Sequence, residues 1–238
     1  MTDLVSYDLG GRIAEVRMDD GKVNALSIPM LRALHAAFDR AESDGAIVVL
    51  FGREGFFSAG FDLGTFAGGE QGQVLEMLEL GARLCERVLS FPTPVLVACP
   101  GHAVAAGAFL PLCADVRIGV EGPFRLGLNE VRIGLTVPWF AIEIARQRLH
   151  PAHFDRALIT ASMYNPLEAV EAGFLDRVVP AADLPTEIRQ AAEAIGELSP
   201  AAHLATKLRV RGKALTALRA AIESELTPDG LGAAQAPS

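Results

Sequence analysis

The sequence lacks the features that mark secreted and membrane-spanning proteins. Its 238 residues contain three cysteines, Cys85, Cys99 and Cys113, an odd number in apolar surroundings that does not suit a disulfide framework. No apolar run is long enough to cross a bilayer, because Gly, Pro and charged residues interrupt the longest ones. The first residues, MTDLVSYDLGGR, lack the basic and apolar segments of a signal peptide. We therefore expect reduced, buried thiols in a cytoplasmic protein that does not bind membranes.

Positive charge is in deficit, and the patterns that bind metals or nucleotides are absent. The formal net charge of −8 opposes a nucleic-acid backbone as partner. Cys99, His102 and Cys113 do not have the spacing of a zinc site, and buried structural roles suit them better. Neither a P-loop nor a dinucleotide-binding glycine motif occurs. We expect no metal and no bound cofactor.

The sequence does contain strand patterns that alternate with helix patterns. Apolar and polar residues alternate on both sides of Gly10-Gly11, which indicates a hairpin. Ser27 has the position of a helix N-cap. The expected elements are a hairpin over residues 5–18, helices over 28–41 and 71–89, and buried strands over 46–51, 95–99 and 116–120. From Asn129 onward the pattern is almost wholly helical, so the fold class is α/β with an α-helical C-terminal region.

This pattern predicts that the chain consists of three parts. Residues 1–185 are expected to form the α/β core, and residues 186–229 a C-terminal helical region. Residues 230–238 are small and polar, as in a disordered tail. No linker divides the chain into independent domains.

Two turns rich in Gly and Ala each follow a predicted buried strand. The first is Phe57-Ser58-Ala59-Gly60-Phe61-Asp62-Leu63, and the second runs from Pro100 to Ala108. Small residues at such a junction let the backbone approach a ligand, and free N–H groups there stabilise a negative oxygen. Small residues at tight turns also serve packing alone, so neither turn by itself identifies a site.

The order of these turns in the chain carries a resemblance to a known family. Asn24-Ala25-Leu26-Ser27, the Phe57–Leu63 turn, Gly101 through Asp115 and Gly127-Leu128-Asn129-Glu130 together resemble the enoyl-CoA hydratase/isomerase (crotonase) superfamily. The resemblance extends to about Leu208. It implies a spiral of ββα turns with a helical C-terminal region, and an acyl-CoA thioester as substrate.

The resemblance also implies an oxyanion hole made of two backbone N–H groups. Matched by position, the donors are those of Phe61 and Ala106. Reaction at an acyl thioester places negative charge on its carbonyl oxygen, and each pre-aimed donor is worth roughly 3 kcal/mol where such donors have been removed. Ala106 replaces the Gly that is usual in the family, which is tolerable if its φ stays negative.

One carboxylate remains where the family's hydratases have two. Glu130 keeps the second position, whereas Phe109 occupies the first. Hydration requires a group that activates water and one that protonates carbon, and a single carboxylate does this poorly. Moving a double bond from the 3,4 to the 2,3 position needs only one base. The segment from Gly127 to Gly134 and the following Pro138-Trp139-Phe140 are similar to Δ3-Δ2-enoyl-CoA isomerases, in which this glutamate is the catalytic acid/base.

Other residues are expected to contact the acyl group or the CoA part of the substrate. Phe109 and Trp139 are expected to form an apolar pocket that raises the pKa of Glu130. Lys22 and Lys207 match places where family members contact CoA, although ordinary surface lysines fit as well. No counterpart of the family's final helix, which covers the adenine with an aromatic residue and a basic cluster, follows Leu215.

Several functions remain open from the residues alone. The leading interpretation is an enoyl-CoA isomerase with Glu130 as its base. A hydratase is the first alternative, and an acyl-CoA binder without catalysis is the second. Thioester hydrolysis, decarboxylation and dehalogenation occur on the same scaffold. The family usually assembles as a trimer or a dimer of trimers, so a homotrimer or hexamer is expected.

Overall fold

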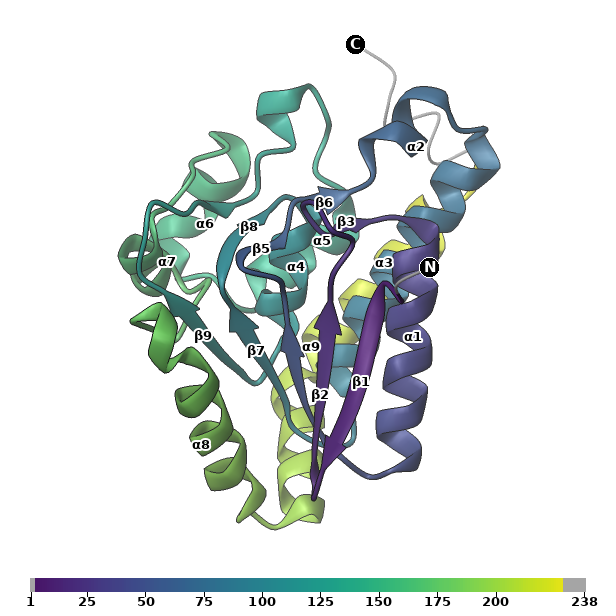
Figure 1. The fold of residues 1–238 in the computed structure, drawn as a ribbon. Coiled ribbons are helices and arrows are strands. Elements are labelled where there is room, and N and C mark those ends of the chain that lie inside the picture. Colours follow the sequence, from purple (N-terminus) through teal and green to yellow (C-terminus); the bar gives the residue numbers. More distant parts are fainter. Residues whose placement is uncertain (1–2, 229–238) are drawn as a thin grey trace.

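The centre of the molecule is a six-stranded sheet (Figure 1). The computed structural model describes residues 3–228. The strands follow the order β1-β2-β4-β7-β9-β11. Among the described residues of this sheet, β1 and β2 form the only antiparallel pair, and the other neighbouring strands are parallel. Their bounds are β1 Val5–Gly10, β2 Ile13–Met18, β4 Ile47–Phe51, β7 Val95–Cys99, β9 Val116–Val120 and β11 Arg177–Val179.

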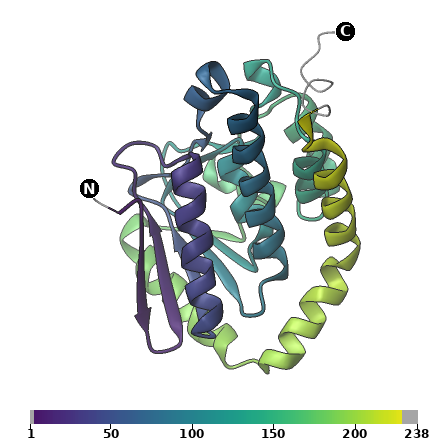
Figure 2. The same ribbon diagram turned by 90° about the vertical axis from the view of Figure 1, so that its right-hand side faces the viewer.

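Helices cover both faces of this sheet. On one face α1 (Ile28–Ser43) and α3 (Gln71–Ser90) lie side by side, and the long α9 (Pro200–Glu225) runs along α3 (Figure 2). On the other face α8 (Leu184–Gly196) packs against β4, β7 and β9. Neighbouring strand residues therefore enter different cores: Val48 and Leu50 pack towards α1 and α3, while Ile47 and Val49 pack towards α8.

Two small sheets continue the strands at one end of the large sheet. β5 (Gly55–Ser58), β8 (Gly101–Val104) and β10 (Leu126–Gly127) form a parallel three-stranded sheet in the order β10-β8-β5. β3 (Ala25–Leu26) pairs with β6 (Gly60–Phe61). Because β5 follows β4 and β8 follows β7, both Gly/Ala-rich turns reach the same end of the molecule.

Short helices complete this end and one side of the molecule. They are α2 Leu63–Gly68, α4 Ala106–Cys113, α5 Trp139–Arg146, α6 Pro151–Ile159 and α7 Pro166–Ala172, with 3₁₀ turns at Val131–Ile133 and Ala181–Asp183. α4 is buried along its whole length, and α5 packs against both α4 and α9. The end of α9 thus lies close to the turns that follow β6 and β8.

Most of the expected elements are confirmed. Ser27 caps α1 by accepting a hydrogen bond from the Met30 N–H, and the three cysteines are free and buried. The region after Asn129 is not almost wholly helical, because β11 adds a parallel strand beside β9. The C-terminal helical region is present as α8 and α9, whereas the division at residue 185 stays a prediction. The predicted tail, residues 230–238, lies outside the described residues.

Across residues 3–228, none of the helices combines the length and the apolar character that a membrane crossing requires.

Candidate active site

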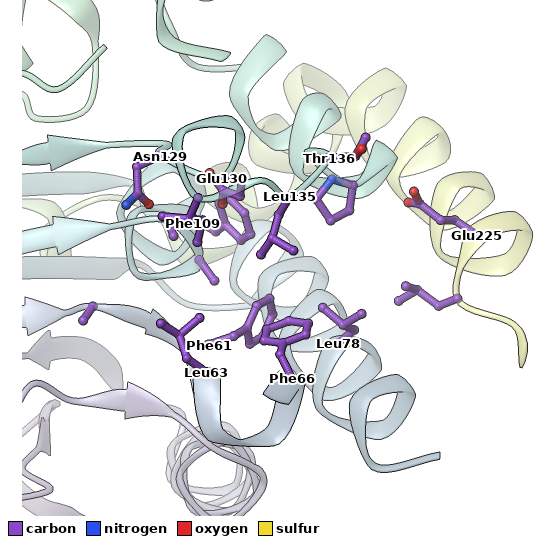
Figure 3. A pocket seen from close by; sticks show the side chains of 16 residues that line it. Phe61, Leu63, Phe66, Leu78, Phe109, Asn129, Glu130, Leu135, Thr136 and Glu225 are labelled. Atoms are coloured by element: carbon purple, nitrogen blue, oxygen red, sulfur yellow. The ribbon is translucent and has the colours of Figure 1, made fainter. Parts of the chain in front are cut away.

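A mostly apolar cavity of about 160 Å³ opens where the turns after β6 and β8, the Glu130 loop and the end of α9 meet (Figure 3). Three of the residues expected from the sequence, Phe61, Ala106 and Glu130, line it together with Phe109. The other lining residues are Ala59, Leu63, Phe66, Leu78, Ala105, Asn129, Ile133, Leu135, Thr136, Pro138, Glu225 and Leu226. The cavity therefore brings together residues that are up to 167 positions apart, from Ala59 to Leu226 (226 − 59).

The first turn is held in place by two buried polar side chains. Asn24, with a φ of 52°, donates from Nδ2 to the carbonyl oxygens of Met18 and Phe57. Ser58 Oγ donates to the Asn24 carbonyl at 2.6 Å and accepts from the Gly60 N–H. These bonds fix the backbone just before Phe61, so its N–H group has a defined position at the cavity.

Asp62 then begins α2. Its carboxylate accepts from the N–H groups of Gly64 and Thr65 and so caps the N-terminus of this helix.

The second turn contains a residue in an unfavourable backbone conformation. Ala105, with φ 50° and ψ −132°, precedes α4, and such a conformation costs a non-glycine residue about 1–3 kcal/mol. Its N–H donates to the Gly127 carbonyl, which ties the turn to the Glu130 loop. Ala106 itself does not have a positive φ, as its proposed role requires. The strain is therefore located one residue before the expected N–H donor.

Ala106 is the first residue of α4, so its N–H group has no acceptor within the helix. The positive end of the α4 dipole adds a favourable potential for a negative oxygen at the cavity. Phe61 and Ala106 line the same cavity, so the expectation that their N–H groups form an oxyanion hole stays a prediction that this arrangement allows.

The two turns are in direct contact. A Cβ placed on Gly60 would lie 3.0 Å from the Ala105 Cβ and 3.1 Å from the Ala106 nitrogen. Likewise, a Cβ on Gly107 would lie 2.2 Å from the Ser58 carbonyl oxygen. Glycine is required at both places because no side chain has room, and Gly60 also has a φ of 95°.

Glu130 supplies an ionisable group to this cavity. Its side chain is 6% exposed, and among the described residues its Oε2 atom has no hydrogen-bond partner. Burial raises the pKa of Glu130 to about 7 because water no longer solvates the carboxylate. A carboxyl group with this pKa can both remove and return a proton near neutral pH.

The loop around Glu130 is a single 3₁₀ turn rather than the start of a helix. The Glu130 carbonyl accepts from the N–H groups of Ile133 and Leu135, and Gly134 ends the turn with a φ of 81°. Glu130 therefore does not lie in the first turn of an α-helix capped by Asn129. Instead the Asn129 Oδ1 atom is buried at the cavity, where no described residue donates a hydrogen bond to it.

Apolar and aromatic side chains form most of the remaining wall. Phe109 packs edge-on against Phe140, with ring centroids 5.9 Å apart, and presents no group that titrates. Trp139 is not part of the pocket, which corrects its predicted role: its side chain is 60% exposed, and Pro138 lines the cavity instead. The buried face of α5 consists of Phe140, Ala141, Ile144 and Ala145, so residue 139 falls on the outer side.

A second carboxylate that the sequence did not reveal also lines the cavity. Glu225, the last residue of α9, accepts a hydrogen bond from the Trp139 N–H at 2.7 Å. It lies at the opposite end of the cavity from Asn129 (Figure 3). No local signal separates Glu225 from the other charged residues of a long helix, so only the packing of α9 against α5 identifies it.

The predicted CoA contact of Lys207 is also corrected. Its ammonium group is buried and lies 2.7 Å from Asp115 Oδ2, and it donates to the carbonyl oxygens of Phe91 and Thr93. Arg211 binds the same aspartate at 3.0 Å. Lys207 therefore anchors α9 to the core at a distance from the cavity, because every donor of its ammonium group faces an internal acceptor.

Asp115 also accepts from the Val95 N–H, so its carboxylate serves the fold and does not line the cavity. Lys22 is exposed beside the first turn and does not line the cavity, so its contact with CoA stays a prediction. Helix α9 continues beyond Leu215 to Glu225, and the expected lack of a helix that covers the adenine stays a prediction. Over residues 3–228, no group of three or more His, Cys, Asp or Glu side chains is arranged to hold a metal ion.

Comparison with known proteins gives a consistent result. The family model of enoyl-CoA hydratase/isomerase matches residues 9–228. A Mycobacterium tuberculosis protein has 41% sequence identity to this chain; one of its solved structures names it an enoyl-CoA isomerase and another names it a probable enoyl-CoA hydratase. The TM-scores are 0.90 and 0.93, with 94% and 97% of this chain and 98% of that chain covered. An enoyl-CoA hydratase from Mycobacterium ulcerans has 39% identity and a TM-score of 0.90, with 93% and 97% covered.

A curated relative extends the comparison to animals. Human mitochondrial enoyl-CoA delta isomerase 1 is 30% identical over 185 residues, which is 74% of this chain. The matched part spans 60% of the length of the human protein. Relatives at similar identity thus have isomerase names and hydratase names, and the names alone do not distinguish the two reactions.

Proposed function

Since the chain belongs to the enoyl-CoA hydratase/isomerase family, and is therefore a crotonase-fold enzyme of acyl-CoA metabolism, we propose that it is a Δ3-Δ2-enoyl-CoA isomerase. The observation that carries the proposal is Glu130: a buried carboxylate whose Oε2 atom has no hydrogen-bond partner in the described chain, in the cavity that Phe61 and Ala106 also line. Its pKa of about 7 suits a group that takes and returns the same proton.

The reaction follows from the positions of three groups. The N–H groups of Phe61 and Ala106 donate to the thioester oxygen of the bound acyl group. The Glu130 carboxylate removes a proton from C2, and the electrons move into a dienolate whose oxygen the two donors stabilise. The protonated Glu130 then returns the proton at C4, which leaves the double bond between C2 and C3. Because Glu130 is buried, water has little access to its carboxyl group, which favours retention of the proton between the two steps.

Hydration is the alternative that the hydratase names support. In the hydratases of this family a second glutamate stands where this chain has Phe109, and an aromatic ring cannot activate water. The second carboxylate of the cavity, Glu225, is already bonded to the Trp139 N–H at the far end. An acyl-CoA binder without catalysis is disfavoured because a buried, unpartnered carboxylate is costly to keep without a use.

The deciding experiment compares turnover of a 3-enoyl-CoA and a 2-enoyl-CoA by the wild type and a Glu130→Gln variant. We expect isomerisation of the first, little hydration of the second, and a loss of activity in the variant of about 10²–10⁴-fold, the usual contribution of a general base. Efficient hydration of the 2-enoyl-CoA by the wild type would overturn the isomerase proposal. If neither substrate reacts although the protein binds acyl-CoA, the acyl-CoA binder without catalysis would be the remaining interpretation.

We propose the assembly and location on the family resemblance alone. They are a homotrimer or hexamer in the cytoplasm, which uses the CoA thioester as substrate and needs no further cofactor, metal or nucleic-acid partner.

A further inference from the structure

The cavity has two chemically different ends. Asn129 and Glu130 lie towards one end and Glu225 lies at the other (Figure 3), and Ala106 and Leu226 also line the cavity. Phe61, Phe66 and Leu78 line the space between these ends. A thioester placed at the first end directs its acyl chain along this apolar wall, so the tip of the chain approaches Glu225.

Two hydrogen bonds hold the end of α9 across the cavity. Glu225 Oε2 accepts from the Trp139 N–H at the start of α5, at 2.7 Å. Three residues further on, the Pro228 carbonyl accepts from Gln71 Nε2 at the start of α3, at 2.8 Å. The end of α9 is therefore attached both to α5 and to α3, and Leu226 is buried between these attachments. This arrangement holds Glu225 and Leu226 in place where they line the cavity.

The volume of the cavity sets a scale for the acyl group. A cavity of about 150 Å³ lined by Leu, Ile and Phe is known to accommodate benzene, so the present cavity of about 160 Å³ suits an acyl group of about six carbons. A longer chain would have to displace Leu226 or cover the Glu225 carboxylate.

We propose that Glu225 determines acyl-chain length: its carboxylate, held by the Trp139 N–H at the far end of the cavity, excludes acyl groups longer than about six carbons. The inference rests on the proposed function in that an acyl-CoA occupies this cavity. It assigns to Glu225 a role in specificity, distinct from the proton transfer assigned to Glu130.

The physical reason is desolvation of a charge. Glu225 is half-buried, and burial already raises its pKa because part of its hydration is lost. An alkyl chain laid over the carboxylate would remove the remaining water and supply no hydrogen bond in return. A shorter chain ends before it reaches Glu225 and leaves that hydration intact. The carboxylate thus acts against long chains without affecting short ones.

The test uses a Glu225→Gln variant, which keeps the shape of the side chain and an oxygen that accepts from the Trp139 N–H. The matched control is Glu223→Ala, an exposed glutamate two residues earlier on the same helix. Isothermal titration at about pH 8 would measure the Kd of saturated acyl-CoA thioesters from about four to about twelve carbons. The kcat/KM of the corresponding 3-enoyl-CoA substrates would be measured in parallel.

For the wild type and Glu223→Ala we expect affinity and kcat/KM to fall at least about tenfold between about six and ten carbons, and for Glu225→Gln less than about threefold. Affinity for the shortest thioesters should not change. An unchanged length profile in Glu225→Gln would overturn the inference, as would a wild type that binds long and short chains equally. Because the titrations use saturated thioesters, a length limit without any isomerisation would refute the proposed function and leave the role of Glu225 standing.

Discussion

Gly60 and Ala105 lie so close that a Cβ on Gly60 would approach the Ala105 Cβ to 3.0 Å. This contact joins the turn that presents the Phe61 N–H to the turn that presents the Ala106 N–H. The distance between the two donors therefore depends on a residue without a side chain, and on the strained backbone of Ala105.

Gly60→Ala should separate the two donors. The new methyl group meets Ala105 and the Val104 carbonyl oxygen, at a φ of 95° that alanine does not adopt readily. We expect kcat/KM for a 3-enoyl-CoA to fall on the order of 10²-fold, which is the effect of losing one oxyanion donor. Gly68→Ala is the control, since a Cβ there meets nothing within 4 Å. Equal activity of both variants would show that the contact between the turns does not position the donors.

Glu130→Gln should stabilise the protein at neutral and alkaline pH while it lowers catalysis by about 10²–10⁴-fold. The folded pKa of about 7 exceeds the ordinary value of 4.5, so the folded state holds the proton more tightly than the unfolded state. The stability of the wild type is therefore complete below about pH 4.5 and decreases as the pH rises through 7. Between about pH 5 and 8 the wild type should lose roughly 2 kcal/mol relative to the variant, at 1.4 kcal/mol per pKa unit. Urea unfolding at the two pH values measures this, and parallel pH dependences would contradict it.

The pH dependence of catalysis provides a separate test of Glu130. Only its deprotonated form accepts the C2 proton, so kcat/KM should rise with pH and level off above an apparent pKa of about 7. Initial rates with a 3-enoyl-CoA between about pH 5 and 9 determine this value. Because kcat/KM reports ionisation of the free enzyme, an inflection near the ordinary glutamate pKa of 4.5 would mean that Glu130 is solvated there and would contradict the raised pKa.

Phe109→Glu should introduce hydration. The side chain at this position lines the same cavity as Glu130, so a carboxylate there would face the substrate. We expect the ratio of hydration to isomerisation to rise at least about tenfold, with a stability cost of about 3 kcal/mol from the lost contact with Phe140. Glutamine has nearly the same shape as glutamate but no charge, so the Phe109→Gln variant should not acquire hydratase activity. If both variants hydrate a 2-enoyl-CoA equally, the added space rather than the carboxylate is responsible.

Lys207→Met should destabilise the fold without weakening substrate binding. It leaves the buried Asp115 with Arg211 as its remaining close cation, and it leaves the Phe91 and Thr93 carbonyls without their donor. We expect the free energy of unfolding to fall by about 3 kcal/mol and KM to change less than about twofold. Lys213→Met, at an exposed position on the same helix, should change stability by less than about 0.5 kcal/mol. A KM increase specific to Lys207→Met would restore the predicted CoA contact.

The predictions from sequence succeeded where the determining interactions are local. β4 and β7 follow from continuous apolar runs, and α1 follows from its Ser27 cap and the spacing of its apolar residues. The four motif segments also carried the resemblance to the family, and with it the expectation that Phe61, Ala106 and Glu130 form one site. The structure brings these three residues to one cavity.

The predictions failed where a side chain's environment depends on distant segments. Trp139 was expected in the pocket, yet the helix it begins turns its other side to the core. Lys207 was expected at CoA, yet it is buried against Asp115, 92 positions earlier (207 − 115). Neither outcome can be read from neighbouring residues, because a cationic or aromatic residue on a helix has the same local pattern whether it faces solvent, ligand or core.

The sequence by itself determined the strands and helices of the core, the two Gly/Ala-rich turns and the presence of a single motif carboxylate, since these depend on periodicity, capping and steric room within a few residues. Tertiary structure alone decided the shape of the cavity and the residues at its far end. Glu225 reaches the cavity because α9 packs along α3 and α5 and is anchored by Lys207 and Arg211. The direction of that long helix is set by the summed contacts of many side chains, and no single segment encodes it.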